Sequence, residues 1–126
     1  MADSFQISGE FSTRPLLGVA SAIPSVIAPL NEVVQVTKKH LDDQTLTVDT
    51  PVPLSFGGLT EAHVVIVKVI GGKVTARFTS ADGATQAVPV DTLFVLISLQ
   101  EPITAIDFTR EPSTEPIVST FLGQRT

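Results

Sequence analysis

Residues 62–99 constrain the fold more than any other part of the chain. They form runs rich in valine and isoleucine, whose β-branched side chains suit a pleated sheet, separated by turns that contain glycine. Gly71-Gly72 stands between two of these runs, and glycine takes the positive φ angles of a tight turn without steric cost. The sequence therefore predicts a β-hairpin here, which pairs strands around residues 65–70 and 73–78.

The second of these strands shows strict alternation of polar and apolar residues from position 73 to position 79. Successive side chains of a strand point to opposite faces of the sheet, so one set is expected in the core. The residues predicted to be buried are Val74, Ala76 and Phe78, and those predicted to face water or a partner are Lys73, Thr75 and Arg77.

Turn signals recur along the rest of the chain about every 8–12 residues, and no amphipathic helix is found between them. The polar segment 38–44 (KKHLDDQ) is predicted to be an exposed turn, and Asp82-Gly83 another. We expect an all-β fold, either an antiparallel β-sandwich or a jelly-roll-like barrel. Further strands are predicted at residues 31–38, 45–50, 62–70, 85–90, 93–99, 102–109 and 117–122.

The N-terminal residues 1–31 are predicted to form an extended arm, and residues 32–126 a single β-sandwich domain. Phe5, Ile7 and Phe11 follow a period of two, the pattern of one short strand. Prolines at positions 15, 24 and 29 exclude a long helix, so residues 18–22 are expected to form one helical turn at most. Because the arm is apolar, we expect it to lie on a surface, its own or that of a neighbour.

Composition favours assembly. The chain has 126 residues, enough for one domain, and only 17% of them are charged, whereas soluble domains typically have about 25%. With 43% hydrophobic residues, the chain is either a sandwich rich in valine, isoleucine and alanine or a subunit that buries surface against others. We favour the second interpretation and expect a homo-oligomer, because uncovered sheet edges with little charge would promote aggregation.

Charge and cysteine content exclude other classes. The net charge is −5, and Lys38-Lys39 is the only adjacent basic pair, so nucleic acid is not an expected partner. The longest charge-free run, residues 15–31, is short and interrupted by prolines, so no membrane span is expected. Arg14 and the residues after it loosely mimic a signal peptide, yet synthesis in the cytoplasm is expected. The absence of cysteine excludes disulfides and thiol chemistry.

The candidate chemical groups are few. His40, Asp42 and Asp43 could approach a divalent cation, but a structural metal site needs three or four protein ligands, and a solvated turn is the simpler interpretation. His63 begins an apolar strand, where a histidine with one hydrogen bond is expected. No G-x-S-x-G motif is present, and neither Gly57-Gly58 nor Gly71-Gly72 is followed by the Lys-Ser/Thr of a phosphate loop. We therefore predict no catalytic residue, no cofactor-binding residue, no metal ligand and no cofactor, and the protein is not expected to be an enzyme.

Several short motifs follow one another from position 50 to the C-terminal region. Residues 50–98 read TPVPLSFGGLTEAHVVIVKVIGGKVTARFTSADGATQAVPVDTLFVLIS, and ITAI at 103–106 and VSTFLG at 118–123 follow. This pattern resembles small β-rich structural proteins of tailed bacteriophages, with F-G-G, A-H-V-x-I-x-K, G-G-K-V and S-A-D-G-A-x-Q-x-V-P-V in order. The resemblance implies a virion component that is placed by self-assembly with other virion proteins, in the capsid, neck or tail.

Two functions from different classes remain. The first is a non-enzymatic virion structural protein, assembled in the cytoplasm of a bacterial host. The second is a small ligand- or receptor-binding β-domain of a phage fibre, which a polar concave face reached by Lys73, Arg77 or Asp82 would favour. The chain contains no tryptophan or tyrosine, the aromatic residues that sugar sites and interaction hot spots prefer, and so no small-molecule substrate is expected.

Overall fold

The structure, a computed structural model, describes residues 3–13 and 25–125, and these contain strands but no helix. The predicted all-β class is therefore confirmed. No helix of the length and hydropathy that crossing a membrane requires is found within these described residues. The strands are β1 (Asp3–Thr13), β2 (Ser25–Val36), β3 (Lys38–Thr45), β4 (Val52–Pro53), β5 (Val64–Ile70), β6 (Val74–Ser80), β7 (Thr85–Val90), β8 (Leu93–Ile97), β9 (Ile103–Arg110) and β10 (Ile117–Gln124).

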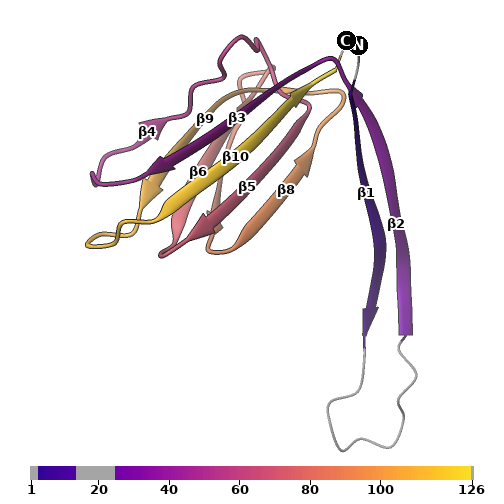
Figure 1. Cartoon of the computed structure of the whole chain (residues 1–126), viewed down its shortest axis with the longest axis horizontal. Helices are drawn as coiled ribbons and strands as arrows, with labels where there is room; N and C mark the ends of the chain where they lie inside the picture. The colour runs from indigo at the N-terminus through magenta and orange to yellow at the C-terminus, as the bar shows by residue number, and fades with distance from the viewer. Residues whose placement is uncertain (1–2, 14–24, 126) are drawn as a thin grey trace, which may run out of the picture.

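Strands β3 to β10 form two antiparallel four-stranded sheets that pack into a sandwich (Figure 1). The first sheet has the order β3-β10-β5-β8, and the second sheet has the order β4-β9-β6-β7. The pairs β3–β10, β4–β9, β5–β8 and β6–β7 are those of one long antiparallel hairpin folded over on itself. This is the strand order of a jelly roll, an architecture of eight strands in two Greek keys.

The fold explains why the predicted hairpin at Gly71-Gly72 is wrong. Both flanking segments are strands, but β5 lies in the first sheet and β6 in the second, so they do not pair. In a folded-over hairpin only the two strands at the tip pair in sequence, and all other connections cross between sheets. Gly71, with a φ of 84°, lies in the turn that carries the chain across.

The tip is the turn at Asp82-Gly83, which joins β6 to β7 as predicted. Gly83 has a φ of 88°, which a residue with a side chain adopts only at a cost in strain. The Asp82 carboxylate accepts hydrogen bonds from the Ser80 hydroxyl and, at 3.0 Å, from the Ala84 amide. The Ser80 bond is the main reason why the pKa of Asp82 is lowered.

Segment 38–44 is not a turn but most of strand β3, and segment 45–50, predicted to be a strand, lies almost wholly outside the ladder. Strand β3 is at the edge of the first sheet, where it pairs only with β10. Charged side chains on an edge strand discourage pairing with a further chain. Residues 38–44 are therefore polar because they form an edge strand, and not because they form a turn.

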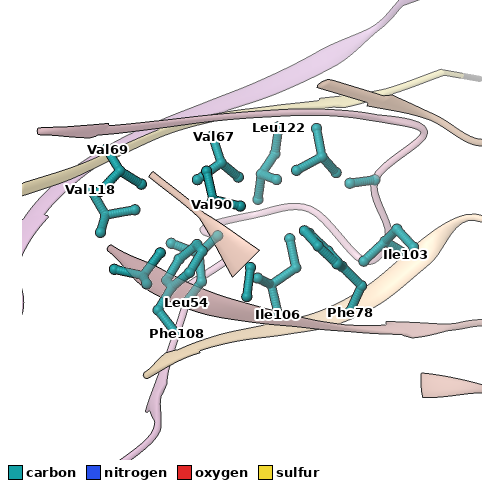
Figure 2. Close-up of a cluster of buried hydrophobic side chains, with 14 of the residues drawn as sticks. Leu54, Val67, Val69, Phe78, Val90, Ile103, Ile106, Phe108, Val118 and Leu122 are labelled. Atoms are coloured by element: carbon teal, nitrogen blue, oxygen red, sulfur yellow. The ribbon is translucent and has the colours of Figure 1, made fainter. Parts of the chain in front are cut away.

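The main core lies between the sheets (Figure 2). Val67 and Val118 from the first sheet point toward Phe78 and Phe108 from the second. The predicted alternation in β6 is confirmed, because Val74, Ala76 and Phe78 are buried whereas Lys73, Thr75 and Arg77 are exposed.

Strands β1 and β2 form a separate antiparallel ribbon, which leaves the sandwich near the C-terminus and runs clear of both sheets (Figure 1). The predicted strand around Phe5–Phe11 is thus one half of a hairpin, and it pairs Phe5 with Val34 and Ile7 with Glu32. The register shifts between Phe11 and Ser12. The helical turn predicted at residues 18–22 lies outside the described residues.

Candidate functional site

The ribbon is anchored to the outer surface of the first sheet at its root. Val34 and Val36 near the end of β2 are buried, and they form a second apolar cluster with Val64 of β5. The amide of Thr37 donates a hydrogen bond of 2.8 Å to the carbonyl of Gln124. Strand β5 is therefore buried on both faces in its first half, as its nearly continuous apolar sequence predicted.

Beyond its root, the ribbon has two faces of different composition. Because register and alternation place residues on faces, the face that carries Val34 also carries positions occupied mostly by apolar residues. A two-stranded ribbon by itself is marginally stable in water, and packing against another layer stabilises it. The positions on this face, here called the Val34 face, are Phe5, Ile7, Gly9, Phe11, Ala28, Leu30, Glu32 and Val34.

A cleft of about 540 Å³ opens between the edges of the two sheets, where β7 and β8 diverge. Its floor contains Phe78 and Phe94, whose rings stack with centroids 5.3 Å apart. Ser80, Ser98 and Glu101 also line the cleft, and the Ser98 hydroxyl donates a hydrogen bond to the main-chain carbonyl of Glu101. The cleft is mainly apolar with a few polar groups, the character of a small-ligand site.

The residues expected to mark a polar binding face do not converge. Lys73 precedes β6 and Asp82 follows it, so a whole strand separates them. Arg77, between them, forms an ion pair with Asp107 of the neighbouring strand β9, with 2.7 Å between Nη2 and Oδ2. Arg77 and Asp82 thus have local partners, and the three residues do not form one site.

The possible cation ligands are divided between the two faces of β3. Alternation places His40 and Asp42 on the face toward β4 and Asp43 on the other. The His40 ring packs against Gly57, which leaves no room for a Cβ, since one built there would lie 2.6 Å from Nδ1. No group of three or more potential metal-ligating side chains is present in the described ranges.

His63 has a structural role. It is buried just before β5, and its Nδ1 accepts a hydrogen bond of 3.1 Å from the Arg125 amide. Its Nε2 lies 3.8 Å from the Glu61 carboxylate. Burial lowers the pKa of His63, an effect that Glu61 opposes and Arg125 reinforces. The neutral imidazole of His63 therefore acts as a hydrogen-bond acceptor that holds the chain at the C-terminal end of β10.

The fold and these groups define an all-β jelly-roll sandwich with a ribbon arm. Comparison of the chain with protein-family models, with curated proteins and with solved structures finds no match. Sequence reasoning missed the anchor of the ribbon, namely Val36 above Gly123. The signal was present as a glycine within an apolar strand, which often marks a close approach of another segment.

Proposed function

We propose that this chain is a non-enzymatic structural protein of a bacteriophage virion, in a capsid-decoration, neck or tail-accessory position. It works by self-assembly, and its β1–β2 ribbon contacts neighbouring copies and other virion proteins. Assembly takes place in the cytoplasm of the host.

The observation that carries this proposal is the ribbon. Its root is packed through Val34 and Val36, whereas its length runs clear of its own sandwich (Figure 1). The Val34 face carries the position of Phe5, which pairs with Val34, and continues outward with the positions of Ile7 and Leu30. An apolar ribbon of this kind is stabilised when a second surface covers it, because each large side chain buried contributes about 1.5–3 kcal/mol.

Two further features support the proposal. The sequence resemblance to tailed-phage structural proteins covers residues 50–98, 103–106 and 118–123, which form β4 to β8 and parts of β9 and β10. Jelly rolls are also a common architecture of viral capsid domains, although a fold alone does not determine function.

Size-exclusion chromatography with light scattering tests the proposal on the full chain. The expected result is a discrete oligomer or a concentration-dependent shift toward one. A monodisperse monomer at the highest soluble concentration would contradict it. Electron microscopy of the same sample would then distinguish a closed ring from an open filament.

The cleft between β7 and β8 favours a second candidate function, a small ligand- or receptor-binding β-domain of a phage fibre. Titration with simple sugars and short amphipathic ligands, followed by NMR, is the test. Saturable shifts confined to residues around Phe94 and Glu101, in a protein that stays monomeric, would favour this alternative over assembly.

A further inference from the structure

The outer faces of the two sheets differ in a way that a free sandwich does not require. On a solvated antiparallel sheet, outward positions are normally polar. The second sheet follows this rule, with Thr75, Arg77 and Asp107 on its outer face. The first sheet departs from it, because it carries four of the five large hydrophobic residues that are exposed in the described part of the chain. These four are Leu41, Ile70, Leu93 and Ile117, and the fifth is Val48.

The register shows that the four residues share one face. Leu41 pairs with Phe121, which in turn pairs with Ile66, and Ile117 pairs with Ile70, so all of these positions have the outward parity of Val64. Leu93 pairs with Lys68, two residues from Ile66 on the same side. The Leu41 side chain is 68% exposed and the Leu93 side chain is 60% exposed. Both residues lie in edge strands of the first sheet, where a neighbouring molecule can reach them.

This face is continuous with a contact that the ribbon already makes. Val34 and Val36 cover Val64 at one end of the sheet, and the row containing Leu41 and Ile66 is the next outward row along the strands. A shallow depression of about 350 Å³ lies there, lined in part by Leu41, Ile66 and Lys68. The molecule's own ribbon covers the end of the face and then turns away (Figure 1).

We propose that the rest of this face receives the β1–β2 ribbon of a second copy of the chain, with the Val34 face toward the sheet. This inference rests on the proposed function and names the surface that it uses. The ribbon is long enough to span the face, since β1 has 11 residues and β10 has 8, each rising about 3.4 Å along the strand. The Val34 face also includes the position of Glu32, and its expected partner is Lys68, which is exposed on the sheet face and lines the same depression as Asp43.

Each copy then presents one ribbon and one acceptor sheet, so the contact is head to tail. Contacts of this type generate rings when the rotation closes and filaments when it does not. The polar outer face of the second sheet is left toward solvent.

The absence of cysteine allows a direct test with the full chain. One preparation carries Ile7→Cys, a second of different isotopic mass carries Leu41→Cys, and the two are mixed under mild oxidation. A third preparation with Thr75→Cys, exposed on the second sheet, is the matched control. We expect the mixed-mass disulfide between Ile7→Cys and Leu41→Cys to form at least about tenfold faster than that with Thr75→Cys. Equal rates would overturn the inference.

A charge exchange gives an independent readout. Lys68→Glu is expected to weaken assembly about tenfold, and Glu32→Lys in the same chain is expected to restore it, because the pair is reversed. Far-ultraviolet circular dichroism verifies that each variant is folded. An oligomer that is unchanged by Lys68→Glu and forms no Leu41→Cys link would overturn the acceptor surface but not the proposed function. A chain that is monomeric at every concentration would overturn both.

Discussion

Val36 lies directly over Gly123, so closely that a Cβ on Gly123 would come within 2.8 Å of Val36 Cγ1. Val36 is the last residue of β2, and Gly123 is near the end of β10, so two segments from opposite ends of the chain meet here. The amide of His63 also donates a hydrogen bond of 2.8 Å to the Gly123 carbonyl. The direction in which the ribbon leaves the sandwich is thus fixed by a contact that only glycine permits.

Gly123→Ala is expected to destabilise the fold by about 1–3 kcal/mol, the usual cost of overpacking. Val36 is β-branched and stiff, so it has little freedom to move away from the added methyl group. The same substitution is expected to cost less in a Val36→Ala background, because the two sites are in contact and their effects couple. Urea unfolding of the four proteins in this cycle is the measurement. Simple additivity of the two effects would contradict the proposed contact.

The sequence predicted the structure correctly where the environment of a residue depends only on its near neighbours in the chain. Alternation identified the buried and exposed sides of β6, and Asp82-Gly83 was correctly placed in a turn. It was misleading where pairing depends on distant segments. Nothing local to Gly71-Gly72 distinguishes a hairpin turn from a crossover, because both need a chain reversal and both accept a positive φ. A hairpin does not form here because β10 and β8 pair with the two edges of β5, which leaves no edge for β6.

The candidate site shows the same limit. The apolar arm was predicted, but its pairing as a ribbon depends on a contact between β1 and β2 across an intervening segment. The polarity of residues 38–44 predicts an exposed turn, since Asp and Lys are depleted in strands. These charged residues discourage pairing with another chain because they lie at a sheet edge. That position depends on the pairing of β3 with β10, which is distant in the sequence.

Phe78→Ala is expected to reduce the free energy of unfolding by about 3–5 kcal/mol. Phe78 is only 4% exposed, and its ring stacks on Phe94 across the sandwich. Thr75→Ala, an exposed position on the same strand, is the control and is expected to change stability by less than about 0.5 kcal/mol. Equilibrium denaturation measures both. A loss below about 1 kcal/mol for Phe78→Ala would show that the ring is not part of a tightly packed core.

Stability is expected to decrease on mild acidification because of His63. Its pKa is lowered below the ordinary value of 6.5 by burial, so the unfolded chain binds a proton more readily than the folded one. The contribution of His63 is fully present above pH 6.5 and is lost as the pH falls through the lowered pKa of the folded state. Denaturation midpoints between pH 7 and pH 5 measure this loss.

His63→Asn is the matched variant for that experiment. The Asn amide oxygen can take the place of Nδ1 as acceptor for the Arg125 amide, but it does not titrate. The variant is expected to lose the part of the pH dependence that lies just below pH 6.5. An unchanged pH profile would mean that another group causes the loss of stability.

Deletion of residues 2–30 is expected to leave a folded domain that keeps a far-ultraviolet β signature but shows reduced assembly. The main core draws its buried side chains from residues 46–122, and the deletion keeps Val34 and Val36, which seal the outer face of β5. What is removed is most of the ribbon, namely β1 and the first half of β2. Light scattering of the truncated and full-length chains at equal concentration is the measurement. Outright unfolding would show that the ribbon belongs to the core of its own subunit, and normal assembly would show that the copies meet through another surface.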